Sequence, residues 1–171
     1  NGTTVEPWDP FARIEPLTET ITAHDVEINT ANGSGIVRLE PFILPPKDGF
    51  STDAAHRRAS GPNNWNRQQG FYIYRANRLI QSGGWSRMRT QDEHTKLARI
   101  GLSFSPDLDS ALGINVAKMR VSIPAQLRQM IERPINEMCS IADEVYRKSA
   151  GSKPSEEKEK QKGGSDQLTQ A

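Results

Sequence analysis

The densest group of side chains that could bind a ligand lies between residues 75 and 99. Three aromatic residues, Tyr72, Tyr74 and Trp85, are close to it in the sequence. Basic residues interleaved with aromatic ones can hold phosphates and stack bases. We favour the plainer interpretation, in which the aromatic rings belong to a core and the cations to a solvated face. The cations are Arg75, Arg78, Arg87, Arg89, Lys96 and Arg99.

A second pair of cations lies in the stretch "INVAKMRVSIP", residues 114 to 124. Lys118 and Arg120 form a short polar step between an apolar strand pattern and a helical one. A cation in such a position could form a charge-assisted bond to an anion outside the domain. The spacing alone favours a simple connecting loop.

Residues typical of metal sites and of nucleophilic catalysis are scattered. His24, His56, His94 and Cys139 are far apart, and none has a second ligand at the spacing of a known metal motif. We therefore expect no metal site. The chain also lacks a GxSxG elbow, a Walker loop and a GxGxxG fingerprint, so we expect no nucleotide pocket formed by this chain alone.

Composition narrows the class of protein. The 171 residues include 22 Lys plus Arg and 21 Asp plus Glu, so a net charge of +1 argues against a strongly basic nucleic-acid binder. A single cysteine excludes an internal disulfide and favours a cytoplasmic setting. No apolar run approaches the roughly 20 residues that span a bilayer, so we expect a soluble protein with no membrane partner.

The composition also divides the chain into three parts. Residues 1–24 contain prolines at 7, 10 and 16 and are expected to form an extended segment that lies on a domain. Residues 25–148 carry the periodic apolar patterns of that domain. Residues 149–171 are almost entirely polar, which predicts a tail or a linker.

Within the domain, strand patterns come first and a long helical pattern follows. Asn32-Gly33 and Ala76-Asn77 each separate two strand-like runs, which predicts two hairpins, and Ile36, Leu39 and Phe42 supply the apolar positions after the first turn. Residues 51–60 favour a short surface helix, and residues 96–105 favour another strand.

The helical pattern covers residues 124–148, where Pro134 predicts a kink or a new helix start. The glycine pair Gly83-Gly84 is interpreted as a turn. The fold class is therefore α+β, with a mixed β-sheet, helices on one face and a long C-terminal helix.

Three stretches together resemble the region behind the ATP-binding module of bacterial GHKL proteins. That group unites gyrase B, the ninety-kilodalton heat-shock chaperones, MutL and the histidine kinases, with the MORC proteins as relatives. "YIYRANRLI" is similar to the "YRN-x-RLI" hairpin of the family, and "INVAKMR" to its "D-V-x-K-S" step and to the chaperones' "N-V-S-R-E" loop. "KLARIGLSF" lies between them, and the resemblance extends from Trp8 to Lys148.

The resemblance implies a transducer domain with the β-α-β fold of a ribosomal protein's second domain. In such relatives a cation of this domain contacts the nucleotide γ-phosphate in the preceding module and couples nucleotide state to domain orientation. By position this cation is Lys118, with Arg120 as the secondary candidate. ATP and Mg²⁺ would bind only in the full-length protein, whose N-terminal ATPase module is the implied partner.

The chain departs from the family pattern at three positions. Ala76, Asn115 and Met119 stand where the family often has Asn, Asp and Ser, and the ATP-binding residues themselves are absent. We expect the fragment alone to be inactive. Two other functions remain open: a nucleic-acid-binding module that uses the cations from Arg75 to Arg99, and a scaffold that forms a homodimer.

Overall fold

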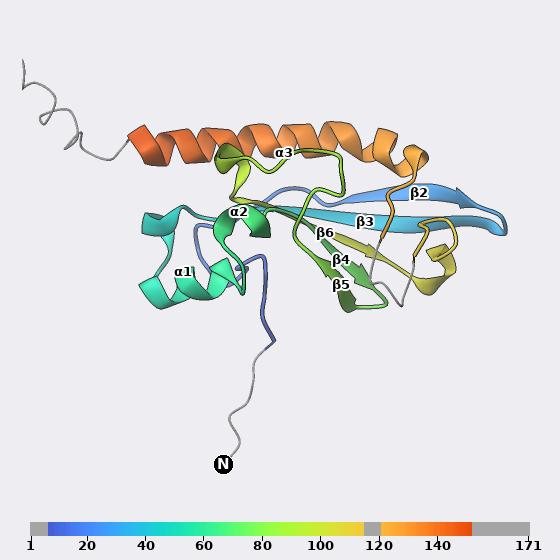
Figure 1. Cartoon of the computed structure of the whole chain (residues 1–171), viewed down its shortest axis with the longest axis horizontal. Helices are drawn as coiled ribbons and strands as arrows, with labels where there is room; N and C mark the ends of the chain where they lie inside the picture. The colour runs from blue at the N-terminus through green and yellow to red at the C-terminus, as the bar shows by residue number, and fades with distance from the viewer. Residues whose placement is uncertain (1–6, 115–120, 152–171) are drawn as a thin grey trace, which may run out of the picture.

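The structure, a computed structural model, describes residues 7–114 and 121–151 and has an α+β architecture (Figure 1). A mixed sheet of six strands lies between a long helix and a second layer of short helices and loops. The strands are β1 Glu19–Thr20, β2 His24–Thr30, β3 Gly33–Ile43, β4 Gly70–Arg75, β5 Arg78–Ser82 and β6 Ala98–Phe104. The helices are α1 Asp53–Ser60, α2 Trp65–Gln68 and α3 Ala125–Gly151, with short 3₁₀ turns η1 Lys47–Gly49, η2 Glu93–Thr95 and η3 Pro106–Leu108.

The longest strand, β3, organises the sheet. One of its edges pairs with β1 and β2, and the other pairs with β6, which is followed by β4 and β5. All these pairings are antiparallel except that of β6 with β4, which is parallel. The sheet is therefore mixed, as the sequence predicts.

Both predicted hairpins are confirmed, and each turn has a clear local cause. Ala76 and Asn77 both have positive φ, 47° and 65°, which matches the twist of the flanking strands β4 and β5. In the first hairpin, Thr30 pairs with Gly33, which has a φ of 131°. The turn itself is thus Ala31-Asn32, one residue earlier than the predicted pair.

The long helix α3 covers one face of the sheet (Figure 1). Its apolar stripe packs against the core-facing side chains of the strands, whereas Met130 of the same helix is 44% exposed. The helix runs unbroken through Pro134, so the prediction of a new helix start there is wrong. Burial of the stripe outweighs the loss of one backbone donor. The buried residues are Leu127, Ile131, Ile135, Met138, Cys139 and Ala142.

A second apolar cluster covers part of the opposite face, so the expectation of helices on one face alone is wrong. Phe11 of the N-terminal segment stacks on Phe42 of β3 at 4.5 Å, and Ala59 of α1 lies in the same cluster. Side chains alternate between the two faces along a strand. Phe42 and Leu39 are three residues apart and therefore lie on opposite faces, and Tyr72 lies on the opposite face from the residues on either side of it. Both Leu39 and Phe42 are buried, whereas Ile36 is half exposed at 51%.

The predicted short helix is confirmed as α1. The Thr52 side chain accepts a hydrogen bond from the Ala55 amide and so caps its N-terminus. Gly61 ends α1 with a φ of 65°, and α2 follows, capped by Asn64. The sequence pattern does not predict α2, because four residues are too short to show a helical period.

The glycine pair 83–84 lies directly against the beginning of β4. The Phe71 amide donates to the Gly84 carbonyl at 2.8 Å, and the Gly84 amide donates to the Gln69 carbonyl at 2.8 Å. A Cβ added at Gly70, where φ is 113°, would lie 2.2 Å from the Gly84 carbonyl oxygen. Glycine is therefore needed here for close backbone approach as well as for the turn.

We expect Gly70→Ala to destabilise the fold by at least ~2 kcal/mol more than Gly33→Ala. Both positions have a positive φ, but a Cβ at Gly33 meets nothing within 4 Å, so the difference isolates the steric conflict with Gly84. Urea unfolding of the two variants measures it. Equal losses would mean that the contact between Gly70 and Gly84 does not constrain the hairpin.

Candidate functional site

Lys118 and Arg120, the two cations that the resemblance to GHKL proteins implies as phosphate contacts, lie outside the described residues. The residues on both sides of them are anchored. Leu112 and Val121 are buried, 1% and 9% exposed, and a Cβ added at Gly113 would lie 3.5 Å from the Ser122 Cβ. The chain therefore leaves and re-enters the described structure at two neighbouring points beside the core.

The turn before this segment is fixed to two parts of the sheet. The guanidinium of Arg75, at the end of β4, makes two-pronged hydrogen bonds to the Asp109 carboxylate at 2.7 to 3.0 Å. The Asp109 carboxylate raises the pKa of Arg75. Leu108 of η3 is fully buried and fills the space above Gly35 in the hairpin of β2 and β3. Arg75 thus has a positioning role in the described structure.

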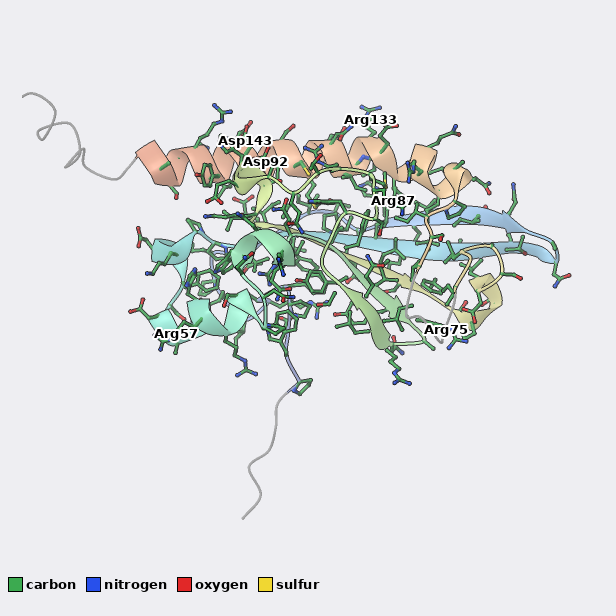
Figure 2. All side chains as sticks on the ribbon, in the orientation of Figure 1. Arg57, Arg75, Arg87, Asp92, Arg133 and Asp143 are labelled. Carbon is green, nitrogen blue, oxygen red and sulfur yellow. The ribbon has the colours of Figure 1, made fainter. Side chains whose placement is uncertain are left out.

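The other predicted cations have different surroundings. Arg78 and Arg87 are exposed. Arg89 donates to the Asn136 side chain of α3 at 2.8 Å, and Lys96 lies 2.5 Å from the Glu93 carboxylate. In Figure 2, Arg87 lies nearer to α3 than Arg75 does.

Arg99 has the most unusual environment of the six, because it is fully buried in β6. Its Nη1 donates to the Pro10 carbonyl at 2.7 Å and to the Ala59 carbonyl at 2.8 Å. These carbonyls come from the N-terminal segment and from the last turn of α1. A single side chain therefore joins two distant parts of the chain to the central sheet.

The charge of Arg99 has no ion-pair partner among residues 7–114 and 121–151. Its guanidinium lies 4.8 Å from the ring centroid of Trp65 and 5.9 Å from that of Tyr72, so aromatic rings contribute to its stabilisation. Burial lowers the pKa of Arg99 to about 10, which leaves it charged at neutral pH. Its Nε and Nη2 have no hydrogen-bond partner within the described part of the chain.

Sequence reasoning placed Arg99 in a surface cluster and missed this role. The available signal was its position within "LARIGL", where apolar residues precede and follow it in a strand buried on both faces. Such a strand leaves no solvent face for a cation. Its partners could not be predicted, because Pro10 and Ala59 are 89 and 40 residues away.

A buried amide, Gln69, fixes the segment between β5 and β6. Its Oε1 accepts hydrogen bonds from the Trp85 indole at 2.9 Å and the Thr95 hydroxyl at 2.8 Å. Its Nε2 donates to the Asp92 carbonyl at 2.9 Å. This contact positions η2 and Lys96 next to α3, and nothing in the local sequence pattern indicated it.

The histidines and the cysteine occupy separate sites. His94 Nδ1 lies 3.0 Å from the Asp143 carboxylate, whereas His56 stacks on Trp65 at 5.0 Å. Burial raises the pKa of the Cys139 thiol to about 11, so it is protonated and a poor nucleophile at neutral pH. No cluster of three or more His, Cys, Asp or Glu residues suited to a metal occurs among the described residues.

Comparisons of the chain with protein-family models, with curated proteins and with solved structures found no match. Within the described ranges, no helix combines the length and the apolar character needed to cross a membrane.

We expect Arg99→Met to speed amide hydrogen exchange in residues 11–18 without unfolding the sheet. The substitution removes both hydrogen bonds to the Pro10 and Ala59 carbonyls. It also removes the cost of burying a charge that lacks an ion-pair partner, so global stability changes little. Hydrogen exchange followed by mass spectrometry measures the effect.

The control for this substitution is Arg133→Met, because Arg133 is 89% exposed on α3. Its exchange pattern should match that of the parent protein. Unchanged protection of residues 11–18 in Arg99→Met would show that Arg99 does not hold the N-terminal segment.

Proposed function

We propose that this chain is the transducer region of a GHKL-type ATPase and that it senses the nucleotide γ-phosphate in a preceding module. The order of the three sequence stretches supports the family. The described α+β fold, with its mixed sheet and long C-terminal helix, supplies strands and a helix for the transducer-type β-α-β fold. The proposal places the protein in the cytoplasm.

The observation that carries the proposal is the attachment of the segment before Lys118. Asp109 and Leu108 fix η3 to the end of β4 and to the hairpin of β2 and β3. In this proposal, a phosphate contact at Lys118 acts on the sheet through the attachment of η3. This is the property that coupling of nucleotide state to domain orientation requires.

In this proposal Lys118 contacts the γ-phosphate and Arg120 is the secondary candidate. A lysine ammonium provides a charge-assisted hydrogen bond to the phosphate and stabilises the negative charge that shifts during transfer. The preceding module holds ATP and Mg²⁺, and this chain binds neither alone.

Nucleic-acid binding has less support from the positions of the cations. Arg99 is buried, and Arg75 is paired with Asp109. The exposed Arg78 and Arg87 leave a smaller basic surface than the sequence cluster suggested. Homodimerisation stays a prediction, without a specific surface to support it.

We expect Lys118→Ala to lower ATP turnover of the longer protein by about 10- to 100-fold, because one charge-assisted bond contributes about 1.5 to 3 kcal/mol. Steady-state ATP hydrolysis by the longer protein measures this, with Lys148→Ala on the exposed side of α3 as the matched control. The isolated chain should be inactive. Full activity of Lys118→Ala would contradict the assigned role.

We also expect Asp109→Asn to lower ATP turnover of the longer protein by about tenfold or less, although Lys118 itself is unchanged. The substitution weakens the contact with Arg75 that fixes η3, so the cation would be positioned less accurately. Asp107→Asn, on the same 3₁₀ turn, is the control. If both variants were fully active, the attachment of η3 would have no part in the coupling.

A further inference from the structure

A groove of about 400 Å³ lies between the C-terminal end of α3 and the elements η1, α2 and η2. Figure 1 shows this end of α3 on the same side of the molecule as α1. The volume falls within the range of small-ligand sites. Apolar atoms of Pro45 and Leu97 line the groove, together with the side chains of Lys47 and Lys96. None of the described residues that flank Lys118, residues 108–114 and 121–124, lines this groove.

The charges around this groove are predominantly positive. Lys47 is exposed on η1, and the Lys96 ammonium is held 2.5 Å from the Glu93 carboxylate and 5.4 Å from the Tyr146 ring centroid. Glu93 is the one carboxylate among the described residues that line the groove, and it is already paired. No second carboxylate among the described lining residues is left to neutralise the positive charge of Lys47.

The buried guanidinium of Arg99 adds a further charge behind the groove. It lies 4.8 Å from the ring centroid of Trp65, which is itself a lining residue. Arg99 has no carboxylate partner within the described ranges, and a charge in the interior is screened less than one on the surface. An anion in the groove would therefore be attracted by the lining lysines and by Arg99.

His56 lines the same groove as the two lysines. Its ring stacks on Trp65 at 5.0 Å with an interplanar angle of 19°. Burial lowers the pKa of His56, and the positive charges of Lys47 and Lys96 lower it further, whereas Asp53 acts in the opposite direction. The pKa of His56 therefore responds to the charges in the groove.

We propose that this groove binds an oxyanion, the phosphate or carboxylate group of a small ligand, through the ammonium groups of Lys47 and Lys96. Lysine side chains bind such groups as point charges with rotatable hydrogen-bond donors. The walls of the groove exclude part of the water that would compete for these donors. His56 is available as a further hydrogen-bond partner at the wall. This site does not depend on the proposed relationship to GHKL ATPases.

The test is an NMR titration of the chain with inorganic phosphate and, separately, with sodium acetate, both at constant ionic strength set by sodium chloride. We expect saturable shifts in residues that line the groove. Bound anion should also raise the pKa of His56, because it offsets the fields of Lys47 and Lys96. Binding of phosphate alone identifies a phosphate-bearing ligand, and binding of acetate alone identifies a carboxylate.

The variants Lys47→Gln and Lys47→Gln/Lys96→Gln should weaken binding by about tenfold or more. Lys47 is exposed, so the single variant should keep the fold even if the loss of the contact between Lys96 and Glu93 disturbs the double variant. Lys148→Gln, which removes the same charge from α3 outside the groove, should bind like the parent protein. Absence of saturable shifts with either anion, or equal weakening by Lys148→Gln, would overturn the proposal.

Discussion

The guanidinium of Arg99 is buried in the central sheet with no carboxylate beside it among the described residues. Burial of a charge is costly unless other groups stabilise it, and here two backbone carbonyls accept hydrogen bonds from Nη1 and two aromatic rings lie against the guanidinium. These contacts explain why the N-terminal segment and α1 lie on the face opposite α3. Other polar contacts act beside them, because Arg13 of the N-terminal segment lies 3.7 Å from the Glu40 carboxylate of β3 and the Trp8 indole donates to the Arg58 carbonyl of α1. Arg99 is the one fully buried charged side chain among the described residues, and it joins both parts of the second layer to β6.

The same strand links this layer to the segment proposed to sense nucleotide. β6 begins next to Arg99 and ends at Phe104, immediately before the turn that Asp109 and Arg75 attach to β4. It is paired along its length with β3 on one side and β4 on the other, so it is held from both edges. In the proposed transducer, a displacement at the phosphate would reach the N-terminal segment through this strand. The preceding module would be covalently connected to that segment.

Local sequence features predicted the local structure well. The turn at Ala76-Asn77 and the apolar period of α3 come from interactions between residues that are near in sequence, so both could be inferred. Of the two alternatives predicted at Pro134, the new helix start is wrong because tertiary burial, which the local sequence does not show, outweighs one lost hydrogen bond. The second layer, the environment of Arg99 and the groove at Lys47 arise from contacts between distant segments. Charge counts along the chain could not predict which cations lie together, since Arg99 and Arg75 are within the same cluster in sequence but have unrelated partners.

We propose that a phosphate contact at Lys118 is transmitted through the sheet to the N-terminal segment. The most direct measurement is amide hydrogen exchange of residues 8–18 and 105–112 in the longer protein, with and without a non-hydrolysable ATP analogue. We predict that the analogue slows exchange in both regions of the parent protein and in neither region of Lys118→Ala, although that variant should still bind the analogue. Equal protection in the parent protein and in Lys118→Ala, or no change in either, would contradict the account.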